Sequence, residues 1–249
     1  MRSLVLLLSL CTFLLPIPAL AADPIVIFAN DTNPPKTWLE NGHTRGALAD
    51  ILHEIEARTN LRFDIRLMPW KRAYMNALES RGGLIGMSRN RMRNILFDFS
   101  EVVFTDELRL VVLKGHEFPY RTMKDLEGKV LGVTRGASYG DEFDRAKGRI
   151  FTPSEDSSTV CRLRMLLAGR IDAALIGPGP TPLQFAIDRD KILMEHRDRF
   201  VVLNPPVIRD ENYIGFTKDM HYLNIIKQIN KAIREMREDG TFERIEARY

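Results

Sequence analysis

The sequence predicts an α/β fold built from two similar units, in each of which buried strands alternate with helices. Short apolar runs bounded by turn residues, at 25–29, 84–87 and 171–176, indicate buried strands. Between the first two of them, apolar side chains recur at helical spacing from Leu48 to Ile55. The order of strand, turn and helix repeats in the second half of the chain, which favours two parallel α/β units.

Residues 1–21 are expected to be a secretory signal peptide. They carry one positive charge at Arg2, an apolar run from Leu4 to Leu15 and an A-x-A cleavage site at 19–21. The apolar run is shorter than the roughly 20 residues that span a bilayer, which disfavours a retained anchor. We therefore expect a soluble, exported protein that begins near Ala22.

Charge and cysteine content exclude several classes of protein. The sequence holds 36 lysine and arginine residues against 33 acids, and loss of Arg2 with the leader brings the net charge to about +2. This balance argues against nucleic acid as a partner. Cys161 is the single cysteine after the leader, so no intramolecular disulfide is expected, and the five histidines are scattered. We expect neither a metal nor another cofactor.

The first unit opens with the strand at 25–29 and a loop at 30–35, whose two prolines exclude a helix. Asn41-Gly42 predicts the turn of a small hairpin. An amphipathic helix begins at Ala47, and the strand at 63–67 alternates apolar and charged residues, as a strand with one solvated side does.

A second helix follows the turn at Pro69-Trp70 and ends near Gly82-Gly83, and the strand at 84–87 leads directly into Ser88. Ligands of parallel sheets bind at the carboxyl ends of the strands. The loop at 30–35, the turn at 69–70 and the turn at Ser88 should therefore meet at one edge of the sheet.

The second unit repeats this order. Its expected elements are strands at 108–113, 130–133 and 171–176, a helical turn at 123–126, a glycine-containing turn at 134–139, and a helix capped by Ser157 that ends at Gly169. The chain returns through a strand at 213–217, a long helix from Leu223 to Met236 that ends at Asp239-Gly240, and a short helix beginning at Thr241.

The stretch from Gly86 to Ser100 is the strongest candidate for a binding element. Ser88 is a good helix N-cap, and the free amides after it favour an anion. Arg89, Arg91 and Arg93 add planar donors that suit a carboxylate or a phosphate. The alternative is that these arginines are simply solvated on a surface turn.

Aromatic and polar residues of the converging loops are further candidates. Trp70 can stack on a ligand at the end of its strand, and Trp38 is a weaker candidate for the same role. Tyr139 and Asn33 lie in the same group of loops. The alternatives are a core position for each tryptophan and a solvent-facing turn position for Tyr139 and Asn33.

Catalytic motifs are not evident in the sequence. It lacks a G-x-S-x-G elbow, a Walker A loop and a G-x-G-x-x-G fingerprint after a strand. The acids expected near the cleft, Asp31, Asp141, Glu142 and Asp210, show no spacing that indicates an acid/base pair. Binding without turnover is the simpler interpretation, so we do not expect an enzyme.

Several motifs together resemble a known family. They are the Gly-Met-Ser turn and Arg93 before Asp98-Phe99-Ser100, the Gly-Val-x-x-Gly turn at 132–138, Gly-Arg-Ile-Asp-Ala at 169–173, the C-terminal signature at 236–245, and Pro-Trp-Lys-Arg-Ala at 69–73. Over nearly the whole mature chain the sequence resembles periplasmic solute-binding proteins of the amino-acid-binding class, extracellular solute-binding family 3, with the type II periplasmic binding fold. Such a protein has two α/β lobes joined by two hinge strands.

The resemblance assigns lobes and ligand contacts. It implies a signal peptide at 1–21, lobe 1 at 22–108 and 209–249, and lobe 2 at 109–208. By the same resemblance, the ligand-binding residues are Arg93 as a bidentate clamp on a carboxylate, Ser88 and the amide of Asn90 beside it, Ser138 from lobe 2, Trp70 as a stacking surface, and Tyr139 and Asn33 in the adjoining loops.

Three positions depart from the family pattern. Gly177 stands where an acid usually grips an α-ammonium, Asn33 replaces an aromatic residue, and Asn30 replaces an aspartate. Loss of the ammonium acceptor removes a charge-assisted hydrogen bond of about 1.5–3 kcal/mol. The hypothesis from the sequence is a small anionic ligand that has a carboxylate and no free ammonium.

The leading functional hypothesis is a monomeric binding component that delivers a small carboxylate-bearing solute, an amino acid or a related compound, to the membrane permease of an ABC importer. One alternative is a periplasmic sensor whose closed form docks on a receptor. The other is an enzyme that resembles cyclohexadienyl dehydratase.

Overall fold

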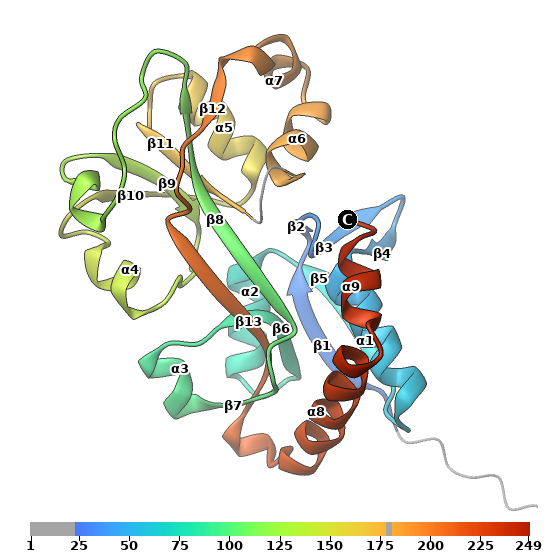
Figure 1. Ribbon diagram of the computed structural model, residues 1–249. Helices are drawn as coiled ribbons and strands as arrows, with labels where there is room; N and C mark the ends of the chain where they lie inside the picture. The colour runs from blue at the N-terminus through green and yellow to red at the C-terminus, as the bar shows by residue number, and fades with distance from the viewer. Residues whose placement is uncertain (1–22, 178–180) are drawn as a thin grey trace, which may run out of the picture.

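The computed structural model describes residues 23–177 and 181–249, and within them one long sheet passes through the whole molecule (Figure 1). Its strand order is β10-β9-β11-β8-β13-β6-β1-β5, with β12 paired to β8 and β7 paired to β13. The strands are β1 (Ile25–Asn30), β5 (Phe63–Met68), β6 (Gly83–Ser88), β7 (Phe97–Phe99), β8 (Phe104–Leu113), β9 (Val130–Thr134), β10 (Thr152–Asp156), β11 (Ala173–Ile176), β12 (Phe200–Val202) and β13 (Ile208–Thr217). A small separate sheet contains β2 (Thr32–Asn33), β3 (Thr37–Glu40) and β4 (His43–Arg45).

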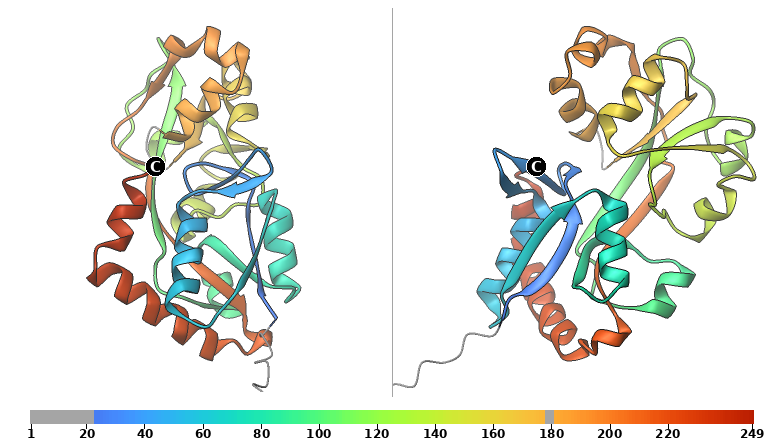
Figure 2. Two further views of the ribbon diagram at one scale, coloured as in Figure 1. Left: turned by 90° about the vertical axis from the view of Figure 1, so that its right-hand side faces the viewer. Right: turned by 180° about the vertical axis from the view of Figure 1, so that it is seen from behind.

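Lobe 1 is a sheet with helices on both faces (Figure 2). Its strand β1 runs parallel to both β5 and β6. The helices are α1 (Ala47–Arg58), α2 (Trp70–Leu78), α3 (Arg91–Leu96), α8 (Leu223–Glu238) and α9 (Thr241–Glu246). One apolar cluster lies under α1, α8 and α9, and a second lies under α2, because each helix buries its apolar stripe against the sheet.

Lobe 2 is built from β9, β10, β11, β12, the second half of β8 and four short helices. They are α4 (Asp141–Ala146), α5 (Thr159–Leu167), α6 (Thr181–Asp188) and α7 (Lys191–Glu195). Single 3-10 turns lie at Met123–Leu126, Arg197–Arg199 and, in lobe 1, at Lys218–Met220. Two further apolar clusters fill this lobe, and their buried members all fall between Leu108 and Leu193.

Strands β8 and β13 connect the two lobes. They pair antiparallel from Leu108 with Ile208 to Phe104 with Asn212, and Figure 1 shows them side by side along the axis of the molecule. Beyond this shared segment, β8 continues into lobe 2 and β13 continues into lobe 1. A movement of one lobe relative to the other must therefore be accommodated in these two strands.

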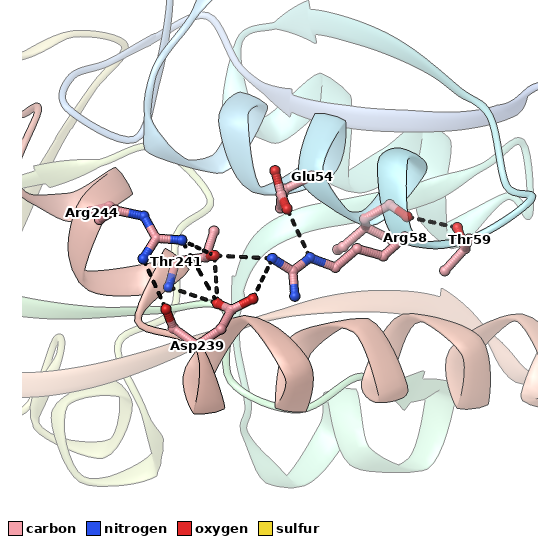
Figure 3. Close-up of polar contacts among 7 residues, drawn as sticks. Glu54, Arg58, Thr59, Asp239, Thr241 and Arg244 are labelled. Carbon is pink, nitrogen blue, oxygen red and sulfur yellow. Dashed lines mark hydrogen bonds and ion pairs between the residues drawn. The ribbon is translucent and has the colours of Figure 1, made fainter.

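A polar junction fixes the C-terminal helices onto α1 (Figure 3). Arg58 donates from Nε to Glu54 at 2.8 Å and from Nη2 to Thr241 Oγ1 at 3.0 Å, and Nη2 lies 2.8 Å from Asp239 Oδ2. Arg244 Nη2 donates to the same Thr241 hydroxyl at 2.6 Å. The junction covers the break at Gly240, whose φ of 73° suits a residue without a Cβ.

The structure confirms most of the predicted elements and corrects several. The hairpin at Asn41-Gly42, the helix stripe from Leu48 and the final two helices are confirmed. Two predicted caps are wrong, as Asn90 rather than Ser88 caps α3 and Ser158 rather than Ser157 caps α5. Strand β10 and helices α6 and α7 were not predicted. The signal peptide lies outside the described residues, and the lobe boundaries stay a prediction.

Candidate ligand-binding cleft

A cavity of about 70 Å³ lies between the lobes, at the carboxyl ends of β1, β6 and β9. Lobe 1, the connecting strands and lobe 2 all contribute to its wall. The lining residues are Asn30, Thr32, Asn33, Lys36, Trp70, Gly86, Ser88, Asp106, Leu108, Thr134, Ala137, Ser138, Tyr139, Ser157, Ser158, Thr159, Arg162, Leu175, Ile176, Gly177 and Asp210. The predicted convergence of loops at one sheet edge is therefore confirmed.

Direct hydrogen bonds join the two lobes across this cavity. Trp70 Nε1 donates to the carbonyl of Gly136 at 3.3 Å. Asn90 Nδ2 donates to Ser138 Oγ at 2.8 Å, and Ser88 Oγ lies 3.2 Å from the carbonyl oxygen of Ser138. These contacts place the cleft in a closed arrangement.

The predicted ligand contacts fall into two groups. Asn33, Trp70, Ser88, Ser138 and Tyr139 line the cavity. The remaining two, at positions 90 and 93, do not line it, although the Asn90 side chain bridges the lobes at its edge.

Arg93 is buried behind the cavity wall. Its side chain is folded back so that Nη1 donates to the carbonyl of Ser88 at 2.8 Å, and the residue is 3% exposed. The guanidinium carbon lies 5.0 Å from the ring centre of Tyr74 and 5.9 Å from that of Trp70. Burial lowers the pKa of Arg93 from its ordinary value. Arg89 and Arg91 are exposed.

Two buried aspartates on the strands that connect the lobes, and a lysine from the loop before β3, form the floor of the cavity. Asp106 and Asp210 face each other across the β8–β13 pair. Lys36 forms an ion pair with Asp106 Oδ2 and donates to Asn212 Oδ1 at 2.8 Å. Burial raises the pKa of Asp210 to about 6, although the Ser88 hydroxyl that donates to it acts in the opposite direction.

Sequence reasoning named Asp210 but missed Asp106 and Lys36. Asp106 had a usable signal, because Phe104, Asp106 and Leu108 alternate in one strand and share its buried face. An aspartate at such a position is unusual unless it is paired. For Lys36 no comparable signal exists, since it follows two prolines in a loop.

The lobe 2 side of the cavity carries a second buried pair. Arg162 binds Asp156 through Nε at 2.8 Å and Nη2 at 2.9 Å, and Nη2 also donates to Thr134 at 2.7 Å. Burial is the largest influence on Asp156 and raises the pKa of its carboxyl, while Arg162 opposes this rise. Arg162 is thus already neutralised within the cavity wall.

Gly177 lines the cavity where the family pattern has an acid, and the structure explains why it carries no side chain. A Cβ at this position would lie 2.8 Å from the carbonyl oxygen of Glu107 and 3.0 Å from Cα of Leu108. Both neighbours are backbone atoms of β8, which cannot move aside without disturbing the connecting strand. The site has therefore lost not only the acid but also the room for it.

Trp38 lies outside this cavity, in the β3 strand. Its ring packs edge-on against Phe185 and Tyr249, with ring centres 5.6 and 5.8 Å apart. Among residues 23–177 and 181–249, no three His, Cys, Asp or Glu side chains are grouped to hold a metal. Within the same residues no helix has both the length and the apolar character to cross a membrane.

A two-lobed α/β fold closed over a polar cavity is typical of solute-binding proteins. The particular family follows from the sequence match: residues 25–249 match the model of bacterial extracellular solute-binding proteins, family 3, and the chain belongs to this family.

The individual relatives share less than 30% sequence identity with this chain and match over part of their length. The chain is 27% identical to the L-cystine-binding protein TcyJ of Escherichia coli K12 over 154 residues, 61% of this chain and 53% of that protein. It is 29% identical to the histidine-binding periplasmic protein of Salmonella typhimurium over 164 residues, 60% of this chain and 58% of that protein. The chain thus spans a little over half the length of these relatives. Both are named as binding proteins and neither as an enzyme.

Solved structures share the fold at low identity. An ArgBP mutant from T. maritima has a TM-score of 0.72 at 20% identity, covering 89% of this chain and 92% of its own. A histidine kinase sensor domain with similarity to periplasmic binding proteins has a TM-score of 0.77 at 18% identity, covering 91% and 96%.

Proposed function

We propose that the protein captures a small carboxylate-bearing solute, an amino acid or a related compound, in the periplasm and delivers it to the permease of an ABC importer. The observation that carries this proposal is the closed interlobe cavity, which five of the seven predicted ligand contacts line.

The proposed mechanism is lobe closure around the solute. Lobe 1 would comprise 22–108 and 209–249, and lobe 2 would comprise 109–208, in a monomer released from the signal peptide at 1–21. Solute held by both lobes stabilises the closed form, because only that form makes both sets of contacts. The permease would then recognise the closed form.

Arg93 is the proposed carboxylate clamp, assisted by Ser88, the amide of Asn90 and Ser138, with Trp70 beside the solute. In the described structure Arg93 Nη1 donates to the neutral carbonyl of Ser88. A carboxylate is a stronger acceptor than a carbonyl, since both partners are then charged. A change of the Arg93 rotamer would let the guanidinium leave the Ser88 carbonyl and donate to the carboxylate of the solute.

Isothermal titration calorimetry of the mature protein against amino acids and other small carboxylates tests the proposal. Arg93→Ala should weaken the best ligand by at least about tenfold to 100-fold, the loss expected for a single charge-assisted hydrogen bond of the clamp. Arg91→Ala is the matched control, because Arg91 is exposed on the same helix and should leave the affinity unchanged. Equal affinities of wild type and Arg93→Ala would refute the clamp.

Sensing is a second candidate, favoured by the fold shared with the sensor domain. Uptake of the labelled ligand by cells that lack the protein distinguishes import from sensing. Unimpaired uptake would favour sensing over import.

Catalysis is the third candidate, favoured by the raised pKa of Asp210 inside a closed cavity. We propose binding alone, in agreement with the relatives named as binding proteins. Turnover of prephenate or arogenate by the purified protein would contradict that view.

A further inference from the structure

The floor of the cavity holds two carboxylates at directly opposite positions of one strand pair. Asp106 of β8 and Asp210 of β13 are register partners, 3% and 9% exposed, and both line the cavity. Like charges directly opposite each other in a sheet destabilise it. The cost is larger for buried groups, since water no longer screens them. A positive charge near both carboxylates would reduce their repulsion.

The described residues supply only part of that charge. Lys36 pairs with Oδ2 of Asp106 and forms no hydrogen bond or ion pair with Asp210, although its charge favours the ionised form of that carboxyl. Asp210 accepts instead from two neutral donors, the Ser88 hydroxyl and, at 3.3 Å, the Asn212 amide. One lysine therefore forms an ion pair with only one of the two carboxylates.

The other cations near the cavity are already engaged. Arg162 is held by Asp156 in the wall of lobe 2. Arg93 lies near enough to favour the charged form of Asp210, but its Nη1 donates to the Ser88 carbonyl.

One carboxylate oxygen of the pair is without a partner. Among the described residues, Oδ1 of Asp106 is buried and accepts no hydrogen bond. A buried polar group without a hydrogen-bond partner destabilises the fold, and a charged one does so more strongly than a neutral one. A donor supplied by a bound molecule would remove that cost.

We propose that Asp106 and Asp210 bind the cationic group of the ligand, a protonated amine or a guanidinium. The inference rests on the proposed function in one respect, that this cavity is where the solute binds. It replaces the sequence hypothesis of a ligand without an ammonium group. The acid that Gly177 cannot provide from lobe 2 is supplied by the connecting strands instead.

An ammonium group matches what the pair lacks. It carries three donors and one positive charge, so it can donate to Asp106 Oδ1 and to Asp210 together. It also brings a positive charge into contact with the second carboxylate, with which Lys36 forms no ion pair. A ligand with both a carboxylate and a cationic group would then span from Ser88 to the floor of the cavity.

Calorimetry with matched compounds tests the inference. The panel pairs arginine with agmatine, histidine with histamine and lysine with cadaverine, so that each amine appears with and without a carboxylate, and adds pyruvate and 2-oxoglutarate, two 2-oxo acids without any cationic group. Amine-bearing compounds should bind, and Asp106→Asn should weaken them by about tenfold to 100-fold, while 2-oxo acids should be little affected.

Two further variants, Asp210→Asn and Asp190→Asn, separate an effect on binding from an effect on folding. Asp106→Asn leaves Lys36 buried and unpaired, so its thermal unfolding and near-ultraviolet circular dichroism must be compared with wild type. Asp210→Asn probes the same pair without disturbing the lysine, and should also weaken amine-bearing compounds. Asp190→Asn is the control, since Asp190 is 8% exposed, lies in lobe 2 and does not line the cavity.

The outcomes separate this inference from the proposed function. Binding of 2-oxo acids but no amine overturns the cation site and leaves a carboxylate-binding protein. Binding of agmatine or cadaverine, lost in both cavity variants, supports the cation site even if the carboxylate clamp fails. Amine binding unchanged in both Asp106→Asn and Asp210→Asn overturns the inference, and binding of no compound overturns both.

Discussion

The indole of Trp70 in lobe 1 donates a hydrogen bond to the carbonyl of Gly136 in lobe 2, at 3.3 Å. Trp70 begins helix α2, directly after Pro69, and Gly136 lies in the turn between β9 and α4 with a φ of 71°. The positive φ suits glycine and lets the carbonyl face the other lobe. One residue predicted as a stacking surface therefore also joins the two lobes.

Replacing Trp70 with phenylalanine removes this hydrogen bond and keeps an aromatic ring. The bond is worth about 1 kcal/mol, so we expect ligand affinity to fall about fivefold, because the closed form loses one contact between the lobes. Calorimetry measures the affinity, and small-angle scattering should show a more open ligand-free protein. A Phe variant that binds as wild type does would show that the bond is unimportant for closure.

Arg162 is predicted to be a stability determinant of lobe 2. Arg162→Leu leaves Asp156 buried without its partner, which should reduce the free energy of unfolding by about 3–5 kcal/mol in urea titrations. The double variant Arg162→Leu with Asp156→Leu should be less destabilised than that single variant, because no buried charge is left unpaired. A double variant as unstable as the single one would contradict this explanation.

Gly177→Asp should fail to restore an ammonium site. The new Cβ would press on the β8 backbone at Glu107 and Leu108, and we expect a loss of about 1–3 kcal/mol in unfolding free energy with no gain in amine affinity. Gly177→Ala tests the cause, since alanine adds only the Cβ. An alanine variant as stable as wild type would show that crowding is not the reason for glycine here.

The stability effect of Asp210 should depend on pH. Its folded pKa of about 6 lies above the ordinary value of 3.8, so the folded protein holds a proton that the unfolded chain releases. Ionisation of the buried carboxyl therefore lowers the free energy of unfolding. This loss is absent below about pH 4, grows up to about pH 6 and is complete above it. At about 1.4 kcal/mol for each pKa unit, it amounts to about 3 kcal/mol.

Asp210→Asn should consequently stabilise the protein at pH 7.5 and have little effect at pH 4. Urea unfolding of the variant and wild type at both pH values measures the difference. The same gain at both pH values would show that the carboxyl does not titrate during unfolding as described.

Local sequence patterns were sufficient to predict most of the helices and strands. The apolar stripe of α1 and the alternation of β5 are each contained in one segment, so their period identifies the element. The place of Asn33, Trp70 and Ser88 in the cavity wall was predictable because each lies at or just after the end of a parallel strand.

The rest depends on pairing between distant segments. Asp106 meets Asp210 only because β8 and β13 pair along five positions, a register that no local pattern specifies. Lys36 reaches that pair from a loop about 70 residues away in the chain. The caps at Asn90 and Ser158 were missed by one or two residues, since helix ends are the least determined part of a periodic pattern.

The cap of helix α5 has a practical consequence. Ser158 and Thr159 line the cavity, the Ser158 hydroxyl accepts from the amide of Cys161, and the Cys161 side chain is exposed on the first turn of that helix. The sequence holds two cysteines, and the other, Cys11, precedes the expected cleavage site. A thiol-reactive fluorophore would therefore label the mature protein at one position on the helix whose first turn lines the cavity, so its emission can test the proposed lobe closure and screen solutes without any substitution.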